Sequence, residues 1–581
     1  MRKAVSVTLL FALSGCATLR TPTATPVEVQ ILAINDFHGA LEPPRASVPA
    51  PGADGATVQV PAGGAAHLAT AVAQLRKGNA NSITVAAGDL TGGSPFASSQ
   101  FLDEPAVMAL NMIGLELNAV GNHEFDRGPE ELLRLQNGGC EKHTVRTPCR
   151  VDGTFPGARF RYLAANVRTA TGETLFPATA LRTFGKGPNT VRVGFIGLTL
   201  KETPTLVVPS AVASLRFEDE AETINALVPK LRAEGAAAVV VLLHQGVTTK
   251  VGYNDKSCGG VSGDLLPILA KLDPGVDVVV SGHTHAAYVC DHAQIDPNRP
   301  FLLTSAGRNG MLVSDITLAI DPAGRRVVSR RADNIIVQGE GYTGPGGPVP
   351  LHPEYRQFAR DPQVSSLVTR YVGAAEPIAQ RVVGRLSAPA LRERNASGES
   401  TLGSLVADAQ LRATSAEIAF MNSGGLRADL TPSADGTLTY GQLYAVQPFG
   451  NVLQVKGLTG AQLRSVLEQQ FASGSNSVER PNMLQVSRGF YYSYDLRRPV
   501  GQRIVAMSLN GAPIDDARVY RVAVSNFLAA GGDNFTAFKS GTDLGGNIED
   551  VDAFEAYFAG NATISPPATG RVNRIDVLLA P

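Results

Sequence analysis

Five short apolar strands that end in metal-binding residue types are the feature that most constrains how this chain can fold. From Val27 to about Ile336, short apolar runs alternate with helical stretches, a pattern typical of layered α/β architecture. The runs at 239–243 and 278–280 are apolar throughout, as expected of strands that are buried on both faces. The first half of the chain is therefore predicted to contain buried strands in a layered fold.

Carboxylate, amide and imidazole side chains follow five of these strands. The strands are predicted at 29–34, 83–87, 117–120, 239–243 and 276–281. The segments that follow them are Asn35-Asp36-Phe37-His38-Gly39, Gly88-Asp89, Gly121-Asn122-His123-Glu124-Phe125-Asp126, His244 and Gly282-His283-Thr284-His285. Because ligands of α/β sheets gather outside the carboxyl ends of the strands, we expect these side chains to converge.

Their chemistry suits two divalent metal ions of the hard or borderline kind, such as zinc or manganese, because no thiolate is among them. Asp36 and His38 are two residues apart, as are His283 and His285, so in extended backbone each pair can face one way. Asp89 stands alone at its strand end and is predicted to be the carboxylate that bridges both ions. Two ions about 3.5–4 Å apart can lower the pKa of a bridging water and clamp a phosphoryl oxygen.

Each motif alone also has a purely structural interpretation, since turns and helix caps use the same residue types. Five of the nine histidines nevertheless lie at predicted strand ends, and no histidine follows Pro353. We therefore interpret the five motifs together as one dinuclear metal centre.

Length and charge set the wider organisation of the chain. At 581 residues it is long enough for two domains. The formal net charge is −1 and neither half carries a long basic run, which argues against binding a polynucleotide. A small anionic substrate remains compatible, because a metal supplies a local positive centre.

A glycine- and proline-rich stretch at 339–353 ends the α/β pattern, and a polar helix is predicted at 354–379. The second half is predicted to be α+β, with a helix at 402–413 and strands at 417–421 and 520–525. The proline-rich segment 43–61 is predicted to be an exposed loop. The expected division is a signal at 1–15, a lipidated tether at 16–26, a catalytic domain at 27–338, a linker and hinge helix at 339–379, and a second domain at 380–581.

The first residues have the pattern of an export signal, with Arg2 and Lys3 before a short apolar run. Leu13-Ser14-Gly15-Cys16 resembles a bacterial lipobox, in which Cys16 becomes the lipidated first residue. An ordinary cleaved signal and a buried cysteine are the alternatives. No later stretch is long and apolar enough to cross a membrane, so the lipid is the only membrane attachment expected.

Four cysteines remain, an even number in a chain predicted to be exported. Sequence order favours disulfides between Cys140 and Cys149 and between Cys258 and Cys290, because each pair closes one local loop. Metal ligation is the competing interpretation, but no close cysteine pair of the zinc-site type occurs.

In this order, the five motifs resemble the metallophosphoesterases of the 5'-nucleotidase family, which includes bacterial UDP-sugar hydrolases and animal ecto-5'-nucleotidases. The resemblance extends through the second half and covers nearly the whole mature chain. The matching segments there are Asn422-Ser423-Gly424-Gly425-Leu426-Arg427, Gln447-Pro448-Phe449-Gly450-Asn451 and Asn526-Phe527-Leu528-Ala529-Ala530-Gly531-Gly532-Asp533-Asn534-Phe535. The fold that it implies is a layered metallophosphoesterase domain followed by an α+β substrate-binding domain.

The resemblance also implies the ligand sets and the residues that assist them. It assigns to one metal Asp36, His38, Asp89 and His285, and to the other Asp89, Asn122, His244 and His283. It further implies that His123 stabilises charge on the phosphoryl oxygens and that Asp126 orients His123 through a hydrogen bond.

In the second domain, Phe449 and Phe527 resemble the two rings that sandwich the base, and Asp533 the acceptor for the ribose hydroxyls. By the same resemblance Asn422 meets the base edge, Arg427 reaches the phosphate or sugar, and Asn451 belongs to the substrate-binding set. Two aromatic faces can each stack on any base for about 1–3 kcal/mol. Core packing of the phenylalanines and a simple Gly-Gly-Asp turn are the competing interpretations.

One segment departs from the family pattern. Relatives place one or two phosphate-gripping arginines just before a Leu-Gly helix start, whereas residues 395–400 intervene here after Arg392 and Arg394. Which of these two arginines reaches the substrate stays open.

The reaction implied is metal-dependent hydrolysis of nucleoside 5'-monophosphates, so the chain is expected to be a phosphoric monoester hydrolase. Alternatives are a 2',3'-cyclic-nucleotide phosphodiesterase with 3'-nucleotidase activity, a UDP-sugar hydrolase and, less closely, a sulfur-oxidation hydrolase. A surface adhesin or nucleotide-binding lipoprotein is the non-enzymatic alternative, against which the complete ligand set argues. The expected location is the periplasmic face of an outer membrane or the cell surface, and the oligomeric state stays open.

Overall fold

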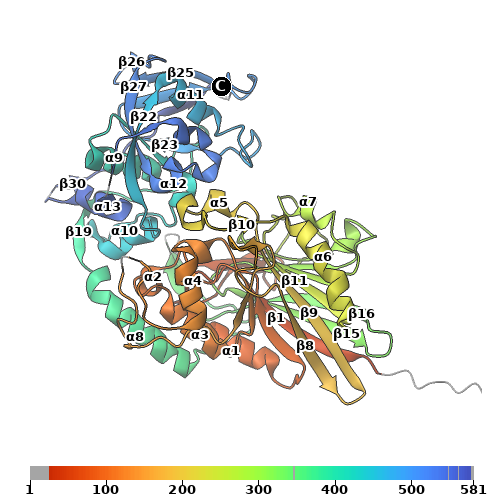
Figure 1. The fold of residues 1–581 in the computed structure, drawn as a ribbon. Coiled ribbons are helices and arrows are strands. Elements are labelled where there is room, and N and C mark those ends of the chain that lie inside the picture. The colour runs from red at the N-terminus through yellow and green to blue at the C-terminus, as the bar shows by residue number, and fades with distance from the viewer. Residues whose placement is uncertain (1–24, 145, 345–346, 547, 561, 577–581) are drawn as a thin grey trace, which may run out of the picture.

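The computed structural model describes residues 25–576 apart from 145, 345–346, 547 and 561. Cys16 and most of the predicted tether lie outside the described residues. Figure 1 shows two halves, one coloured red to green and the other cyan to blue, joined along one side. Nowhere in the described chain is a helix both long and apolar enough to cross a membrane.

Two six-stranded sheets form the first half. The first has the order β16 (Arg326–Ile336), β15 (Leu312–Asp321), β1 (Val27–Ile34), β4 (Ser82–Ala86), β5 (Leu117–Ala119), β6 (Arg161–Leu163). The second has the order β13 (Ala287–Asp291), β14 (Leu302–Ala306), β12 (Val278–Ser281), β11 (Ala238–His244), β9 (Asn189–Thr199), β8 (Thr179–Lys186). Strands β1, β4, β5 and β6 are parallel, and so are β9, β11, β12 and β14.

The sheets pack face to face. Ile31 and Val85 from the first sheet share one buried core with Phe195 and Val240 from the second. Helices α1 (Ala65–Arg76), α3 (Glu104–Ile113) and α4 (Gly128–Asn137) contribute to the core on the other face of the first sheet, and α6 (Glu220–Ala233) and α7 (Leu266–Leu269) to that of the second. This layering confirms the predicted α/β class.

The hinge-region helix is shorter than predicted. Helix α8 spans Pro362–Ala379, because the Asp361 carboxylate caps its start by accepting hydrogen bonds from the backbone N–H groups of Gln363 and Val364, both at 2.9 Å. Residues 354–361 are therefore not helical. Helix α8 packs beside α1, α2 (Phe96–Ser99) and α3 before the chain enters the second half (Figure 1).

The prediction of an exposed loop at 43–61 is wrong. Strands β2 (Ser47–Pro51) and β3 (Thr57–Pro61) pair as an antiparallel hairpin. Val48, Ala50 and Val60 are buried against the first half, and a two-stranded ribbon with free edges tolerates prolines that lack an N–H donor.

The second half is α+β, as predicted. Its main sheet has the order β23 (Leu484–Val486), β20 (Ile418–Asn422), β27 (Val519–Ser525), β22 (Val452–Thr459), β28 (Thr542–Asp543), with β29 (Ile548–Glu549) also on β22. Its helices include α9 (Thr401–Thr414), α10 (Tyr440–Val446), α11 (Gly460–Glu468), α12 (Asn526–Ala529) and α13 (Asp550–Phe558). A smaller sheet has the order β26 (Ala512–Pro513), β25 (Ile504–Leu509), β24 (Phe490–Tyr494), β31 (Val572–Arg574).

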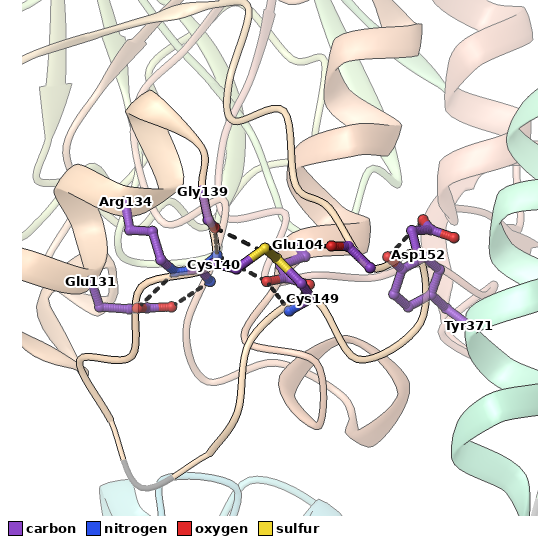
Figure 2. The surroundings of a disulfide bond; sticks show 9 residues. Glu104, Glu131, Arg134, Gly139, Cys140, Cys149, Asp152 and Tyr371 are labelled. Atoms are coloured by element: carbon purple, nitrogen blue, oxygen red, sulfur yellow. Dashed lines mark hydrogen bonds and ion pairs between the residues drawn. A yellow bond between two sulfur atoms is a disulfide. The ribbon is translucent and has the colours of Figure 1, made fainter.

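Both predicted disulfides form, between Cys140 and Cys149 and between Cys258 and Cys290. Figure 2 shows that the first lies beside the buried Arg134, which contacts Glu104 at 2.9 Å and Glu131 at 2.7 Å. The Glu104 carboxylate also accepts a hydrogen bond from the backbone N–H of Cys149 at 3.0 Å. The cysteine-closed loop is thereby tied to the core of the first half.

Candidate active site

All seven predicted metal ligands lie at one edge of the two sheets. Asp36 and His38 follow β1, Asp89 follows β4 and Asn122 follows β5. His244 is the last residue of β11, and His283 and His285 follow β12. The parallel strands of both sheets place these side chains together, as the sequence predicted.

The ligand atoms gather into two groups. In the first, Nε2 of His285 lies 3.1 Å from Nε2 of His38 and 3.4 Å from Oδ1 of Asp36. In the second, which contains Asp89, His244 and His283, Oδ1 of Asn122 lies 3.2 Å from Nε2 of His244 and 3.1 Å from Nδ1 of His283.

Asp89 lies between the groups. Its Oδ2 is 3.0 Å from Nε2 of His244 and 3.7 Å from Nε2 of His38. Its other oxygen accepts a hydrogen bond from the backbone N–H of His123 at 2.9 Å. One carboxylate thus approaches a nitrogen of each group, which is the geometry that a bridging ligand needs.

The ligand pairs do not converge through extended backbone, contrary to the sequence-based expectation. Asp36, His38, His283 and His285 have φ of 49°, 47°, 69° and 57°, and Asp89 has φ of 51°. These are left-handed conformations beyond the strand ends, which side-chain-bearing residues adopt at a cost of about 1–3 kcal/mol each. Tight turns, rather than the alternation of side chains along a strand, therefore orient the Asp36–His38 and His283–His285 pairs toward the site.

Neighbouring polar residues hold these turns in place. The buried Glu124 carboxylate accepts hydrogen bonds from the backbone N–H groups of Asp89 at 2.9 Å, Leu90 at 2.7 Å and Gly121 at 2.7 Å. A side chain at Gly121 has no room, because a Cβ atom there would lie 2.2 Å from Oδ1 of Asp89. Asn35 donates to Oδ2 of Asp36 at 2.7 Å. Sequence reasoning missed Glu124 and Asn35, although both stand inside the motifs.

The electrostatics fit metal ligands. Burial, with a further contribution from Asp89, raises the pKa of Asp36 to about 7. Burial lowers the pKa of His38 and of His283 to about 3, so both rings are neutral and keep a lone pair for a cation. Burial opposes protonation of His244 as well, but Asp89 raises its pKa to about 10.

The donor set consists of two carboxylates, one amide oxygen and four imidazoles, without thiolate. That composition fits two divalent ions of the zinc or manganese type.

His123 lies at the mouth of this centre. Its Nδ1 is 3.0 Å from both carboxylate oxygens of Asp126, whose Oδ2 also accepts from the backbone N–H of Gly93 at 3.1 Å. Burial opposes the charge on His123, but Asp126 and Asp89 raise its pKa above the usual value. The ring of Phe449 stacks on His123 with centroids 5.5 Å apart and an angle of 11° between the planes.

A cavity of about 190 Å³ joins this centre to the second half of the chain. From the first half its wall takes Asn122, His123, Asp126, Leu206, Val207, Val208 and His283. From the second half it takes Asn422, Gly424, Gly425, Arg427, Phe449, Asn451, Phe527 and Asp533. Every predicted substrate residue except the two upstream arginines therefore lines one cavity. Sequence reasoning missed the apolar wall at 206–208.

Within this cavity, Asn422 donates from Nδ2 to Oδ2 of Asp533 at 2.7 Å. Asp533 has a left-handed backbone with φ of 53°, and burial raises the pKa of its carboxyl. The Arg427 guanidinium lies over the Phe449 ring, 5.6 Å from its centroid. Phe449 and Phe527 both line this cavity, and the ring of Phe449 also stacks on His123.

A second cavity, of about 800 Å³, opens on the other side of the centre beside His38 and His285. Arg392 lines it, together with Arg308 and Arg427, whereas Arg394 is exposed and is not among its lining residues. Nη1 of Arg308 lies 3.4 Å from Nδ1 of His285. Of the two upstream arginines, Arg392 is therefore the one that faces the site. Sequence reasoning missed Arg308, which follows β14 without a recognisable motif.

Each half of the chain matches a known protein family. Residues 29–287 match the calcineurin-like phosphoesterase family model, and residues 382–540 match the 5'-nucleotidase C-terminal domain. The cell wall protein Lmo0130 of Listeria monocytogenes is 31% identical over 92% of this chain and 67% of its own length. The endonuclease YhcR of Bacillus subtilis is 28% identical over 89% of this chain, which spans 38% of that protein. The 5'-nucleotidase precursor of Thermus thermophilus superposes with a TM-score of 0.72 at 25% identity, over 95% of this chain and 100% of that one.

Proposed function

Since the chain belongs to the 5'-nucleotidase family of two-domain metallophosphoesterases, we propose that it hydrolyses nucleoside 5'-monophosphates to a nucleoside and phosphate. The observation that supports this proposal most is the 190 Å³ cavity, whose wall runs from His123 and His283 to Phe449, Phe527 and Asp533. A phosphoryl group at the metal-ligand end and a base at the aromatic end fit opposite ends of one substrate.

One ion is proposed to be held by Asp36, His38, Asp89 and His285, and the other by Asp89, Asn122, His244 and His283. Two divalent ions supply Lewis acidity and activate water at neutral pH. The chain orients these ligands from behind: the Gly92 carbonyl accepts from Nδ1 of His38 at 2.8 Å, and the Ala87 carbonyl accepts from Nδ1 of His244 at 2.7 Å. Each Nε2 is left to face the ion.

His123 is proposed to donate from Nε2 to a phosphoryl oxygen. Asp126 holds the Nδ1 proton of the ring and favours its doubly protonated form. Arg427 and Arg392 are proposed to grip the substrate anion, with Arg308 as a third guanidinium from the first half. These cations offset charge that increases on the phosphoryl oxygens in the transition state.

Phe449 and Phe527 are proposed to stack on the base and Asp533 to accept from the ribose, with Asn422 and Asn451 at the cavity wall. The first domain is proposed to span 27–338 and the second 380–581, with α8 in the hinge region between them. Rotation at this hinge, which opens the cavity to substrate, is part of the proposal.

A UDP-sugar hydrolase is the second candidate, and one specific observation favours it. The 800 Å³ cavity beside His38 and His285 leaves space for a group beyond the attacked phosphoryl, and Arg308 supplies a cation there. A 5'-monophosphate leaves that space unfilled.

The protein is further proposed to be exported and anchored through a lipid on Cys16, on the periplasmic face of an outer membrane or at the cell surface. Two disulfides support an oxidising compartment. The related Listeria protein is named a cell wall protein.

Hydrolysis of 5'-, 3'- and 2',3'-cyclic nucleotides and of UDP-glucose, with the nucleoside, nucleotide, sugar phosphate and phosphate products separated and quantified, tests the substrate assignment. Each substrate is measured with the metal-loaded protein and again after chelation. The proposal expects the highest kcat/KM for a 5'-monophosphate and loss of turnover with chelator. A higher kcat/KM for UDP-glucose selects the second candidate, and a preference for 3'- or cyclic substrates contradicts both.

A further inference from the structure

A buried polar contact between the two halves has no part in the proposed chemistry. The hydroxyl of Tyr444, on α10, hydrogen-bonds to Oγ of Ser99 at the end of α2. Both residues are 1% exposed. Burial of two hydroxyl groups is unfavourable unless each finds a partner, and here each hydroxyl is a partner of the other.

The neighbouring hydrogen-bond partners determine which of the two hydroxyl groups donates in this contact. Tyr444 donates its single proton to the backbone carbonyl of Pro448 at 2.8 Å. The Ser99 proton is then the one shared with Tyr444, and Oγ of Ser99 in turn accepts from Nη2 of Arg127 at 2.9 Å. Each hydroxyl thus donates one hydrogen bond and accepts another.

From Arg127 the connection reaches the metal centre. Nη1 of Arg127 lies 2.7 Å from Oδ2 of Asp103, and the same oxygen accepts from the backbone N–H of Gly92 at 3.2 Å. The Gly92 carbonyl accepts from Nδ1 of His38 at 2.8 Å. A continuous set of hydrogen bonds therefore links Tyr444 to a candidate metal ligand.

From Tyr444 the connection also runs through Pro448 to Phe449, which lies at the end of the cavity proposed to bind the base. Pro448 immediately precedes Phe449, whose ring stacks on His123 at 5.5 Å. A carbonyl held at residue 448 restricts where the next side chain lies. Through the Tyr444 hydroxyl, the loop that carries Phe449 is also tied to Ser99 of the first half.

We infer that Tyr444 is a positioning residue, which sets the distance between the base-stacking Phe449 and the metal centre through Ser99, Arg127 and Asp103. The inference rests on the proposed function. A misplacement of about 1 Å at the reacting centre can cost on the order of a hundredfold in rate, so a contact of this kind affects turnover of a substrate bound at both ends. A substrate bound only by its phosphoryl group does not depend on it.

Tyr444→Phe tests the inference because it removes only the hydroxyl and keeps the ring packed against Phe96, at 5.0 Å between centroids. Tyr440→Phe is the matched control. Tyr440 lies on the same helix and packs on the same Phe96 ring at 5.7 Å, and its hydroxyl has no hydrogen-bond partner among the described residues. Adenosine 5'-monophosphate and 4-nitrophenyl phosphate serve as the substrates with and without a base.

We expect Tyr444→Phe to lower kcat/KM for adenosine 5'-monophosphate by about five- to fiftyfold, as removal of a buried hydrogen-bond partner does. Hydrolysis of 4-nitrophenyl phosphate and metal content should change little, and Tyr440→Phe should match the wild type. Ser99→Ala should reproduce the effect. The double variant should be no worse than the more affected single one, because both changes break the same contact.

Three results would overturn the inference. An equal fall for both substrates would mean a general structural role, and unchanged kinetics in Tyr444→Phe and Ser99→Ala would mean no role. A wild-type protein with no preference for the nucleotide over 4-nitrophenyl phosphate would overturn the proposed function, and the inference with it. The first two results overturn the inference alone and leave the proposed function standing.

Discussion

The metal-ligand edge and the base cavity are built in different ways. All seven candidate ligands come from strand ends of one pair of sheets, and Asp36 and His244 are fully buried. The base cavity takes its residues from several separate segments of both halves, and it shares Asn122 and His283 with the metal-ligand edge. One domain can therefore hold the chemistry in a preformed site, whereas selection of the substrate depends on how two domains meet.

Asp89→Ala gives the largest effect that this comparison predicts. Because Asp89 approaches a nitrogen of each ligand group, its loss should lower metal content at both sites and reduce activity by more than about a thousandfold. Metal analysis of the purified variant beside its phosphate release measures both. Two ions retained per chain would contradict the bridging role.

His123→Ala separates metal binding from turnover. The proposed contact of His123 is with the phosphoryl group, so kcat should fall by about a hundred- to a thousandfold while metal content stays near that of the wild type. The same metal analysis and steady-state kinetics apply. A loss of metal equal to that in Asp89→Ala would show that the two residues do not have separate roles.

Replacing both Phe449 and Phe527 by alanine tests the other side of the comparison. Loss of about 1–3 kcal/mol of stacking per ring, not fully additive, predicts a fall of roughly tenfold to several-hundredfold in nucleotide kcat/KM. Hydrolysis of an aryl phosphate should change little, although Phe449 also contacts His123. A parallel fall for both substrates on a folded, metal-loaded preparation would identify these rings as packing residues.

Arg308→Ala has the smallest expected effect. Because Arg308 is exposed at the edge of the larger cavity, its removal should raise the KM for a nucleotide by about three- to tenfold, which corresponds to roughly 1 kcal/mol for an exposed charge. Arg394→Ala is the control, since Arg394 does not line that cavity, and should change KM by less than about twofold. Equal effects of the two variants would mean that overall charge, not position, is what matters.

Much of this arrangement was predictable, because the spacing of apolar residues, the glycine- and proline-rich breaks and the residue types are local properties of the sequence. The buried strands, the α+β second half, both disulfides and the convergence of all seven candidate ligands followed from local patterns and strand order. The segment 43–61 was misjudged because its prolines outweighed the alternation of Val48 and Ala50, and its burial depends on residues far away in the chain. The start of α8 was missed because Asp361 and Pro362 were not treated as a cap.

The residue types that can bind two metal ions, and their order along the chain, were determined by the sequence alone. Only the tertiary structure decided that left-handed turns aim them, that Arg392 rather than Arg394 faces the site, and that Arg308 and Glu124 belong to it. The contact between Tyr444 and Ser99 joins residues that are 345 positions apart. Such contacts depend on how two domains pack, and no local pattern in either segment records that packing.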